Sequence, residues 1–208
     1  MKCAQDVREI LIDNTIRLIA EGGFEKATTK AITHSGEMVA EIKMNEAYIY
    51  RLFGSKENLY EVAFASLDKE FVGALHNYIN SVENFYSYPK QKLYEVFINT
   101  WNFLLNSEEH CRCYVRYYYS VYFKGSSLEN HNLLFSDIVL TLKPLFKVEA
   151  DVEAIMHSVL TAMFDFAIRV YNGDLKNDDI NTPHIFNVLY CMMATYFKDE
   201  ILQKIKTE

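Results

Sequence analysis

The stretch NEAYIYRLFGSKENLY, residues 45–60, decides the fold because a single glycine divides it into two helices. Asn45 is of a type that begins a helix, since its side-chain oxygen can accept a hydrogen bond from a free backbone N–H group. Gly54 can adopt the left-handed conformation that ends a helix, and Ser55 can cap the next one. The stretch therefore predicts a short helix followed directly by a longer helix.

The short helix has two different faces. Ile49, Leu52 and Phe53 recur at helical spacing and are expected to pack on other helices. Tyr48 and Arg51 face away from them. An exposed helix with hydrogen-bonding side chains suits the major groove of DNA, so we interpret this helix as one that contacts bases.

The residues before the stretch predict two supporting helices. The first begins near Asp6 and ends at Gly22. Thr28 or Thr29 then caps the second. Together with the short helix they predict a helix-turn-helix module, which binds DNA in several classes of protein.

The composition predicts a folded, helical, cytoplasmic protein. Half of the 208 residues are hydrophobic, with only three prolines and seven glycines. We expect no membrane association, because no apolar run approaches the roughly 18 residues of a membrane helix and the N-terminus lacks the apolar core of a signal peptide. The net charge of −7 opposes nucleic-acid binding, but residues 26–56 carry five basic and three acidic residues, a local charge of +2. A ligand responds to the local field, which leaves a small basic face possible.

The remainder of the chain predicts further helices separated by turns. The clearest breaks lie at Tyr88-Pro89, at residues 125–127 and at residues 172–174. The expected helices cover about 55–86, 90–106, 109–123, 128–146, 151–172 and 183–205. The predicted fold class is therefore all-α, with about nine helices in total.

Aromatic side chains are concentrated between residues 94 and 123. An aromatic stripe at helical spacing fits a packed core. The many tyrosines, whose hydroxyl groups need partners when buried, also fit a pocket for a small apolar or aromatic molecule. Both interpretations stay open at this point. The residues expected to line such a pocket are Trp101, Tyr114, Tyr117, Tyr118 and Phe164.

The last two predicted helices are apolar on nearly all sides. Helices of this kind must bury more than one face. One face can cover the core of the chain and the other requires a partner chain, which predicts a homodimer. The residues expected at its interface are Ile155, Val159, Met163, Ile185, Leu189 and Met192.

Two segments carry a resemblance to a known family, REILIDNTIRLIAEGGFEKATT at residues 8–29 and the opening stretch at residues 45–60. The strongest matches are Gly23-Phe24, Thr28-Thr29, Ile49-Tyr50, Phe53 and residues 55–59. Together they resemble the DNA-binding module of the TetR family of bacterial transcriptional regulators. The resemblance implies a helix-turn-helix DNA-binding domain at residues 1–54 and a helical ligand-binding and dimerisation domain at residues 55–208.

The resemblance also implies a function. Family membership would make the chain a homodimeric transcriptional regulator, expected to be a repressor, that binds a double-stranded DNA operator under the control of a small-molecule effector. The two threonines would cap a helix and contact phosphates, the first turn of the short helix would face the groove, and Tyr50, Lys56 and Arg51 would hold phosphates or, for Arg51, a base. The residues implied in DNA contact are Thr28, Thr29, Asn45, Glu46, Ala47, Tyr48, Tyr50, Arg51 and Lys56.

The sequence departs from the family pattern in three places. Lys43 stands where the family usually has a glycine in the turn before the recognition helix. The segment from Ile32 to Met44 is longer than the pattern, and Leu52 occupies a position that commonly holds a phosphate contact. We expect these differences to change how the short helix meets DNA.

Two other classes of protein remain as alternatives. A helical small-molecule or lipid-binding protein without DNA binding would explain the apolar helices, but it leaves residues 45–60 unexplained. An enzyme would need paired carboxylates in a pocket, a Gly-rich phosphate loop or a Cys/His arrangement, and none is apparent in the sequence. We therefore expect no enzymatic activity, no cofactor and no metal.

Overall fold

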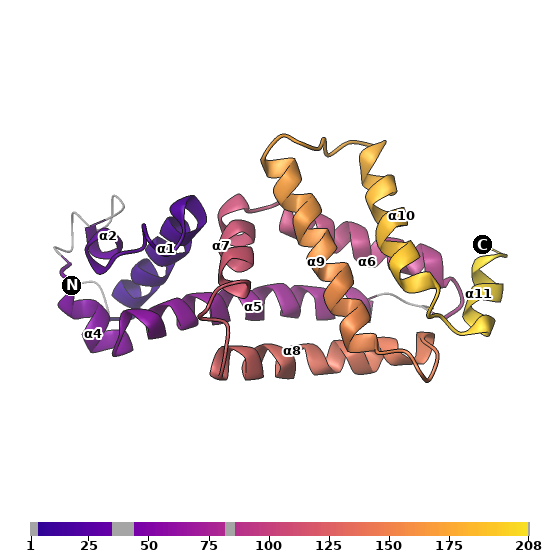
Figure 1. Ribbon diagram of the computed structural model, residues 1–208, viewed down its shortest axis with the longest axis horizontal. Coiled ribbons are helices and arrows are strands. Elements are labelled where there is room, and N and C mark those ends of the chain that lie inside the picture. Colours follow the sequence, from indigo (N-terminus) through magenta and orange to yellow (C-terminus); the bar gives the residue numbers. More distant parts are fainter. Residues whose placement is uncertain (1–3, 35–43, 82–85, 208) are drawn as a thin grey trace. The chain divides into compact units, whose positions relative to one another are not determined.

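The computed structural model describes residues 4–34, 44–81 and 86–207, and helices dominate these ranges (Figure 1). Within them, strand-type pairing is limited to one isolated bridge between Phe146 and Phe197. The all-α fold predicted from the sequence is confirmed. The elements in chain order are α1 (Ala4–Gly22), α2 (Thr29–His34), α4 (Ala47–Phe53), α5 (Lys56–Ser81), α6 (Pro89–Leu104), α7 (Glu108–Tyr118), α8 (Ser126–Leu142), a 3-10 turn (Lys143–Leu145), α9 (Val152–Tyr171), α10 (Asn181–Ala194) and α11 (Asp199–Ile205).

The helix predicted over residues 183–205 is in fact two helices, α10 and α11. The backbone between them pairs with the segment after α8: Lys147 N donates to Tyr196 O at 2.9 Å, and Lys198 N donates to Leu145 O at 3.0 Å. Phe197 lies in the segment between α10 and α11, and its side chain is fully buried. These backbone groups cannot also make the hydrogen bonds of a continuous helix, so the helix is interrupted here.

The helix predicted over residues 109–123 is also shorter, because α7 ends at Tyr118. Beyond Tyr118, the side chain of Ser120 makes hydrogen bonds with the backbone in place of the next helical turn. Its hydroxyl donates to Tyr117 O at 2.7 Å and accepts from Tyr122 N at 3.1 Å. Serine side chains compete with helical hydrogen bonds in this way. The turn carries the Tyr122 ring to 4.7 Å from the Phe24 ring, centroid to centroid.

The chain divides into two compact units. The first comprises Met1–Glu70 and Ser107–His131, and the second comprises Phe71–Asn106 and Asn132–Glu208. The grouping follows packing and therefore places α7 with the N-terminal helices. The expected boundary between a DNA-binding domain at residues 1–54 and a ligand-binding domain at residues 55–208 is based on function and stays a prediction.

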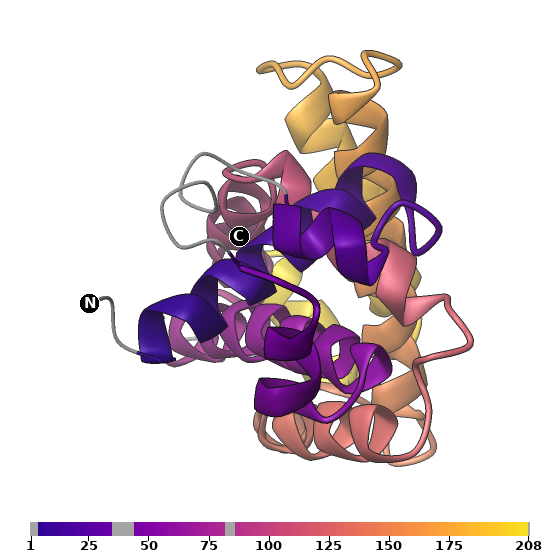
Figure 2. The same cartoon turned by 90° about the vertical axis from the view of Figure 1, so that its left-hand side faces the viewer.

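The first unit holds the predicted helix-turn-helix, whose helices face the viewer in Figure 2. Its core contains fully buried aliphatic side chains from every one of these helices. Burial of this apolar surface is the main force that fixes α4 against the others. The fully buried aliphatic residues are Leu11 and Ile19 of α1, Ile32 of α2, Ile49 of α4 and Leu59 of α5.

The second unit is built around α9. Among the helices of the described ranges, α9 is the one that is long and apolar enough to cross a membrane by length and composition. Core helices of water-soluble proteins share these properties. Seven side chains of α9, the first at Val152 and the last at Ala167, are buried within the chain. Of the apolar 18-residue window of α9, 33% is buried inside the chain, so packing in the second unit accounts for part of its apolar character.

Candidate nucleic-acid interface

The helix α4 presents one buried and one exposed face, although Tyr48, expected on the exposed face, is half-buried. Ile49 and Phe53 are buried, while Arg51 is exposed and the side chain of Tyr50 is 54% exposed. Leu52 is half-buried and therefore belongs partly to the packed face. A seven-residue helix that buries one face and exposes a tyrosine and an arginine on the other can offer both to a ligand outside the chain.

The N-terminus of α4 is tied to the N-terminus of α2. The Thr29 hydroxyl donates a hydrogen bond to the Glu46 carboxylate. Ala47 N donates to Asn45 Oδ1 at 3.1 Å, which satisfies one free N–H group of the helix. Asn45, Glu46 and Thr29 therefore have structural partners, although Asn45 and Glu46 are exposed.

Thr28, and not Thr29, caps α2. Ala31 N donates to Thr28 Oγ1 at 3.1 Å, the spacing of a helix N-cap. The sequence had left the choice between the two threonines open. With Thr28 at the cap and Thr29 bonded to Glu46, the two helices of the predicted helix-turn-helix are joined at their first turns.

Two aromatic rings hold the basic side chains of this region. The Arg51 guanidinium carbon lies 4.4 Å from the centroid of the Tyr48 ring, and Lys56 Nζ lies 5.5 Å from the centroid of the Tyr60 ring. A cation over an aromatic face is attracted by the ring quadrupole. The rings therefore limit the directions in which these two cations can extend.

Lys56 is the first residue of α5. The Ser55 hydroxyl accepts from Asn58 N at 3.0 Å and caps this helix, while Gly54 has φ 80°, a conformation that disfavours other residues. Lys56 thus lies in the first turn of a long helix, where backbone N–H groups and the helix dipole favour an anion such as a phosphate.

Buried polar contacts that sequence analysis did not single out hold the module together. Asn14 Nδ2 of α1 donates to Ile32 O at 2.9 Å, and the Tyr60 hydroxyl donates to Ala27 O at 2.5 Å. Burial raises the pKa of Tyr60, so its phenol remains a donor. A polar residue at a core position, such as Asn14 on the apolar face of α1, is the sequence feature that indicates such a buried hydrogen bond.

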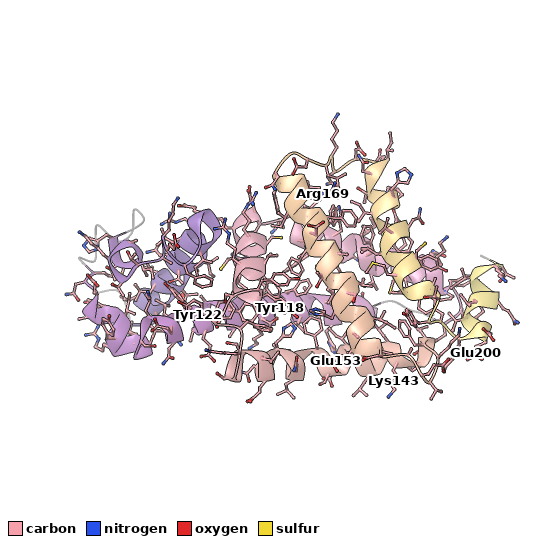
Figure 3. The ribbon with its side chains drawn as sticks, in the orientation of Figure 1. Tyr118, Tyr122, Lys143, Glu153, Arg169 and Glu200 are labelled. Atoms are coloured by element: carbon pink, nitrogen blue, oxygen red, sulfur yellow. The ribbon has the colours of Figure 1, made fainter. Side chains whose placement is uncertain are left out.

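The helix α7 also contacts the N-terminal module. Arg116 Nη1 donates to Ile19 O near the end of α1 at 2.7 Å. The Phe24 ring lies 5.1 Å from Tyr60 and 6.2 Å from Tyr117, centroid to centroid. Tyr118 and Tyr122, labelled in Figure 3, mark the segment that joins α7 to α8. Three of the tyrosines considered for a pocket or a core thus belong to the first unit.

The five residues expected to bind a ligand are divided between the two units. Tyr114, Tyr117 and Tyr118 lie in the first unit, and Trp101 and Phe164 lie in the second. The side chains of Tyr114, Tyr117, Trp101 and Phe164 are buried.

Polar groups among these residues bind within the chain. The hydroxyl groups of Tyr117 and Ser127 lie 2.9 Å apart, and Trp101 Nε1 donates to Asn177 Oδ1 at 2.9 Å. The Tyr117 hydroxyl, one of the tyrosine groups that suggested a pocket, and the Trp101 indole N–H therefore have partners within the chain.

A cavity of about 60 Å³ lies in the second unit. None of the five residues expected to bind a ligand lines it. Hydrophobic periodicity marks core residues but does not reveal which of them surround an empty space, so the sequence carried no signal for this set. The lining residues are Leu75, Ile79, Leu93, Val96, Phe97, Thr100, Leu142, Leu145, Phe146, Met156, Val159, Leu160, Met163, Phe186, Leu189 and Met193.

The residues expected at a dimer interface lie mostly inside the chain. A side chain that is already covered by its own core offers no surface to a partner. The exposed side of α10 instead carries Val188 and Cys191, with Met192 half-buried beside them and Tyr196 exposed just beyond the helix. The expected interface residues that are buried are Ile155, Val159, Met163, Ile185 and Leu189.

The part of the chain before α4 leaves one expectation untested. Lys43 and the greater part of the segment from Ile32 to Met44, residues 35–43, lie outside the described residues.

Comparison with known proteins identifies relatives of the N-terminal module and of the fold. Residues 11–63 match the family described as bacterial regulatory proteins, tetR family. No curated protein matches the sequence.

Solved structures of TetR-family regulators share the fold of the whole chain. A TetR family transcription regulator from Marinobacter aquaeolei VT8 is similar with a TM-score of 0.73 and 14% identity, over 90% of this chain and 95% of that one. A TetR-like transcriptional regulator from Rhodococcus sp. RHA1 is similar with a TM-score of 0.63 and 19% identity, over 92% and 95%. SmeT, the repressor of the Stenotrophomonas maltophilia multidrug efflux pump SmeDEF, is similar with a TM-score of 0.64 and 14% identity, over 95% and 94%.

Proposed function

We propose that this chain, whose residues 11–63 match the tetR family of bacterial regulatory proteins, is a cytoplasmic repressor whose operator binding as a homodimer is controlled by a small, largely apolar or aromatic ligand. The observation that carries the proposal is the exposed face of α4. Ile49 and Phe53 fix the helix to the module, and Tyr50 and Arg51 remain available to DNA.

The charge distribution supports DNA contact at this face. The chain as a whole is acidic, but Lys26, Lys30 and Arg51 of the first unit are exposed, and Lys56 lies in the first turn of α5. Exposed charges farther away than about 8–10 Å are largely screened at ordinary salt concentration. The exposed carboxylates of Glu46 and Glu57 offset part of this charge, so the local groups leave a small positive balance on an acidic chain.

Selection of bound duplexes from a random DNA library tests this proposal. We expect enriched sites with two-fold symmetry, because a symmetric dimer places two copies of α4 in major grooves about 34–36 Å apart or at multiples of that distance. Affinity should fall steeply as salt rises, since Lys and Arg displace counterions from DNA. Failure to enrich any sequence would refute specific DNA binding, and asymmetric sites would count against the homodimer.

The proposed dimer uses the exposed side of α10. Replacing Val188, whose side chain is 49% exposed, by glutamate is expected to give monomers, because each copy would bring a charge into an apolar interface. Light scattering coupled to size-exclusion chromatography measures the mass. The matched control is Val148→Glu, at a loop position that is 94% exposed and should leave the dimer intact. A wild-type protein that elutes as a monomer at micromolar concentration would contradict the proposal.

A further inference from the structure

The cavity in the second unit has an unusually uniform chemistry. Among its 16 lining residues, 15 are aliphatic, aromatic or methionine, and the remaining one is Thr100. They come from the end of α5, from α6, α9 and α10, and from the end of α8 and the segment that follows it. Among the residues that the structure describes, this lining includes no side chain with an ionisable group.

Thr100 does not offer its hydroxyl donor to the cavity. Thr100 Oγ1 donates to Val96 O at 2.8 Å, a hydrogen bond within α6. Thr100 is buried, and its methyl group is apolar like the rest of the lining. The described lining residues therefore present an apolar surface to the cavity.

We propose that this cavity binds an uncharged hydrocarbon group and that it discriminates against carboxylates and ammonium ions of the same shape. The inference rests on the proposed function, because it names the chemical class of the controlling ligand. A charged group that enters the cavity would lose its hydration and gain no ionic or hydrogen-bonding partner, which is strongly unfavourable. An uncharged group loses little and gains dispersion contacts with the lining.

The size of the cavity restricts the ligand further. Its volume of about 60 Å³ is well below the roughly 150 Å³ of an engineered apolar cavity in another protein that binds benzene. A ring can enter only if lining side chains move. Met156, Met163 and Met193 are unbranched and adapt readily to new shapes, so they are the side chains expected to make room.

Three probes that share one ring test the inference: toluene, benzoate and benzylammonium, added to the free protein at pH 7 and followed by calorimetry. We expect toluene to bind at least about 100-fold more tightly than either ion, given the cost of burying an unpaired charge. The single tryptophan gives a second signal, because Trp101 stacks at 6.0 Å on Phe97, a residue of the lining.

Filling the cavity provides the control. Leu160→Phe adds volume to the lining and is expected to weaken toluene binding at least about 10-fold, since overpacked sites lose space for a guest. Leu140→Phe makes the same change on α8, at a side chain that is 64% exposed, and should bind toluene like the wild type. If Leu160→Phe does not fold, Val96→Phe on α6 fills the cavity from another side.

The outcomes separate this inference from the proposed function. Equal affinity for toluene and either ion, absence of binding by all three probes, or normal toluene binding by both filling variants would overturn the inference. Operator binding is measured without any probe and on the same protein. A chain that binds its operator but fails these tests is still a DNA-binding regulator, with a ligand of another class.

Discussion

Replacing Asp68 by leucine is expected to lower the free energy of unfolding by about 3 kcal/mol, since the substitution removes the buried carboxylate that two neighbouring polar side chains contact. The Asp68 side chain is 2% exposed. Its carboxylate accepts from the Tyr114 hydroxyl at 2.9 Å and lies 3.0 Å from His131 Nδ1. These contacts join α5, α7 and α8 inside the first unit.

The chemistry of Tyr114 makes the loss large. Burial and the neighbouring Asp68 carboxylate raise the pKa of Tyr114 well above its usual value, so the phenol keeps its proton and must donate it. Replacement by leucine would remove the buried hydrogen bond of this phenol and the contact of His131 with the same carboxylate. Asp68→Asn keeps one acceptor oxygen and should cost less than Asp68→Leu.

Urea unfolding followed by circular dichroism measures the effect, with Glu70→Leu as the matched control. Glu70 lies two residues further along α5, and its carboxylate is 3.6 Å from His110 at the surface. Exposed ion pairs contribute little, so this control should change stability by no more than about 0.5 kcal/mol. Equal stability of Asp68→Leu and Glu70→Leu would show that the buried contacts do not hold the first unit together.

The sequence predicted the existence and order of the helices because their signals are local. Caps, glycines and hydrophobic periodicity lie within a few residues of each helix end. The break between α10 and α11 has a different origin, since it depends on backbone pairing of residues 196–198 with residues 145–147. A contact between segments that are about 50 residues apart leaves no local pattern to recognise.

The candidate site divides in the same way. The exposure of Arg51 on α4 could be predicted, because Arg51 lies opposite the buried Ile49 and Phe53 on the helix. Tyr48, expected beside it, is half-buried. The interface and ligand residues depend on which neighbour covers an apolar side chain. Apolar character alone does not distinguish the core, a cavity and a partner chain. Of the residues expected at the interface, Ile155 is buried in the core and Leu189 lines the cavity.

Replacing either Tyr48 or Arg51 by alanine is expected to lower affinity for the best operator by about 1–3 kcal/mol, roughly 5- to 150-fold. The guanidinium of Arg51 rests on the Tyr48 ring at 4.4 Å. Arg51 is exposed and Tyr48 half-buried, so the ring acts as a platform for the cation and both belong to one contact.

Because the pair acts together, the double variant should lose about 1 kcal/mol less than the sum of the two single variants, the size expected for an exposed cation–π contact. Additive losses would mean that Tyr48 and Arg51 contact DNA independently. A double-mutant cycle on the selected duplex measures the coupling.

Lys56→Ala is the contrasting control, because a lysine at the start of α5 can reach a phosphate but not a base edge. It should weaken the best site and a scrambled duplex equally and reduce the salt slope by about 1. The loss in Tyr48→Ala and Arg51→Ala should instead be larger for the best site than for the scrambled duplex, since base contacts exist only there. If Tyr48→Ala weakens both duplexes to the same extent, the tyrosine holds the DNA backbone, and base recognition must lie with Ala47 and the other exposed residues of α4.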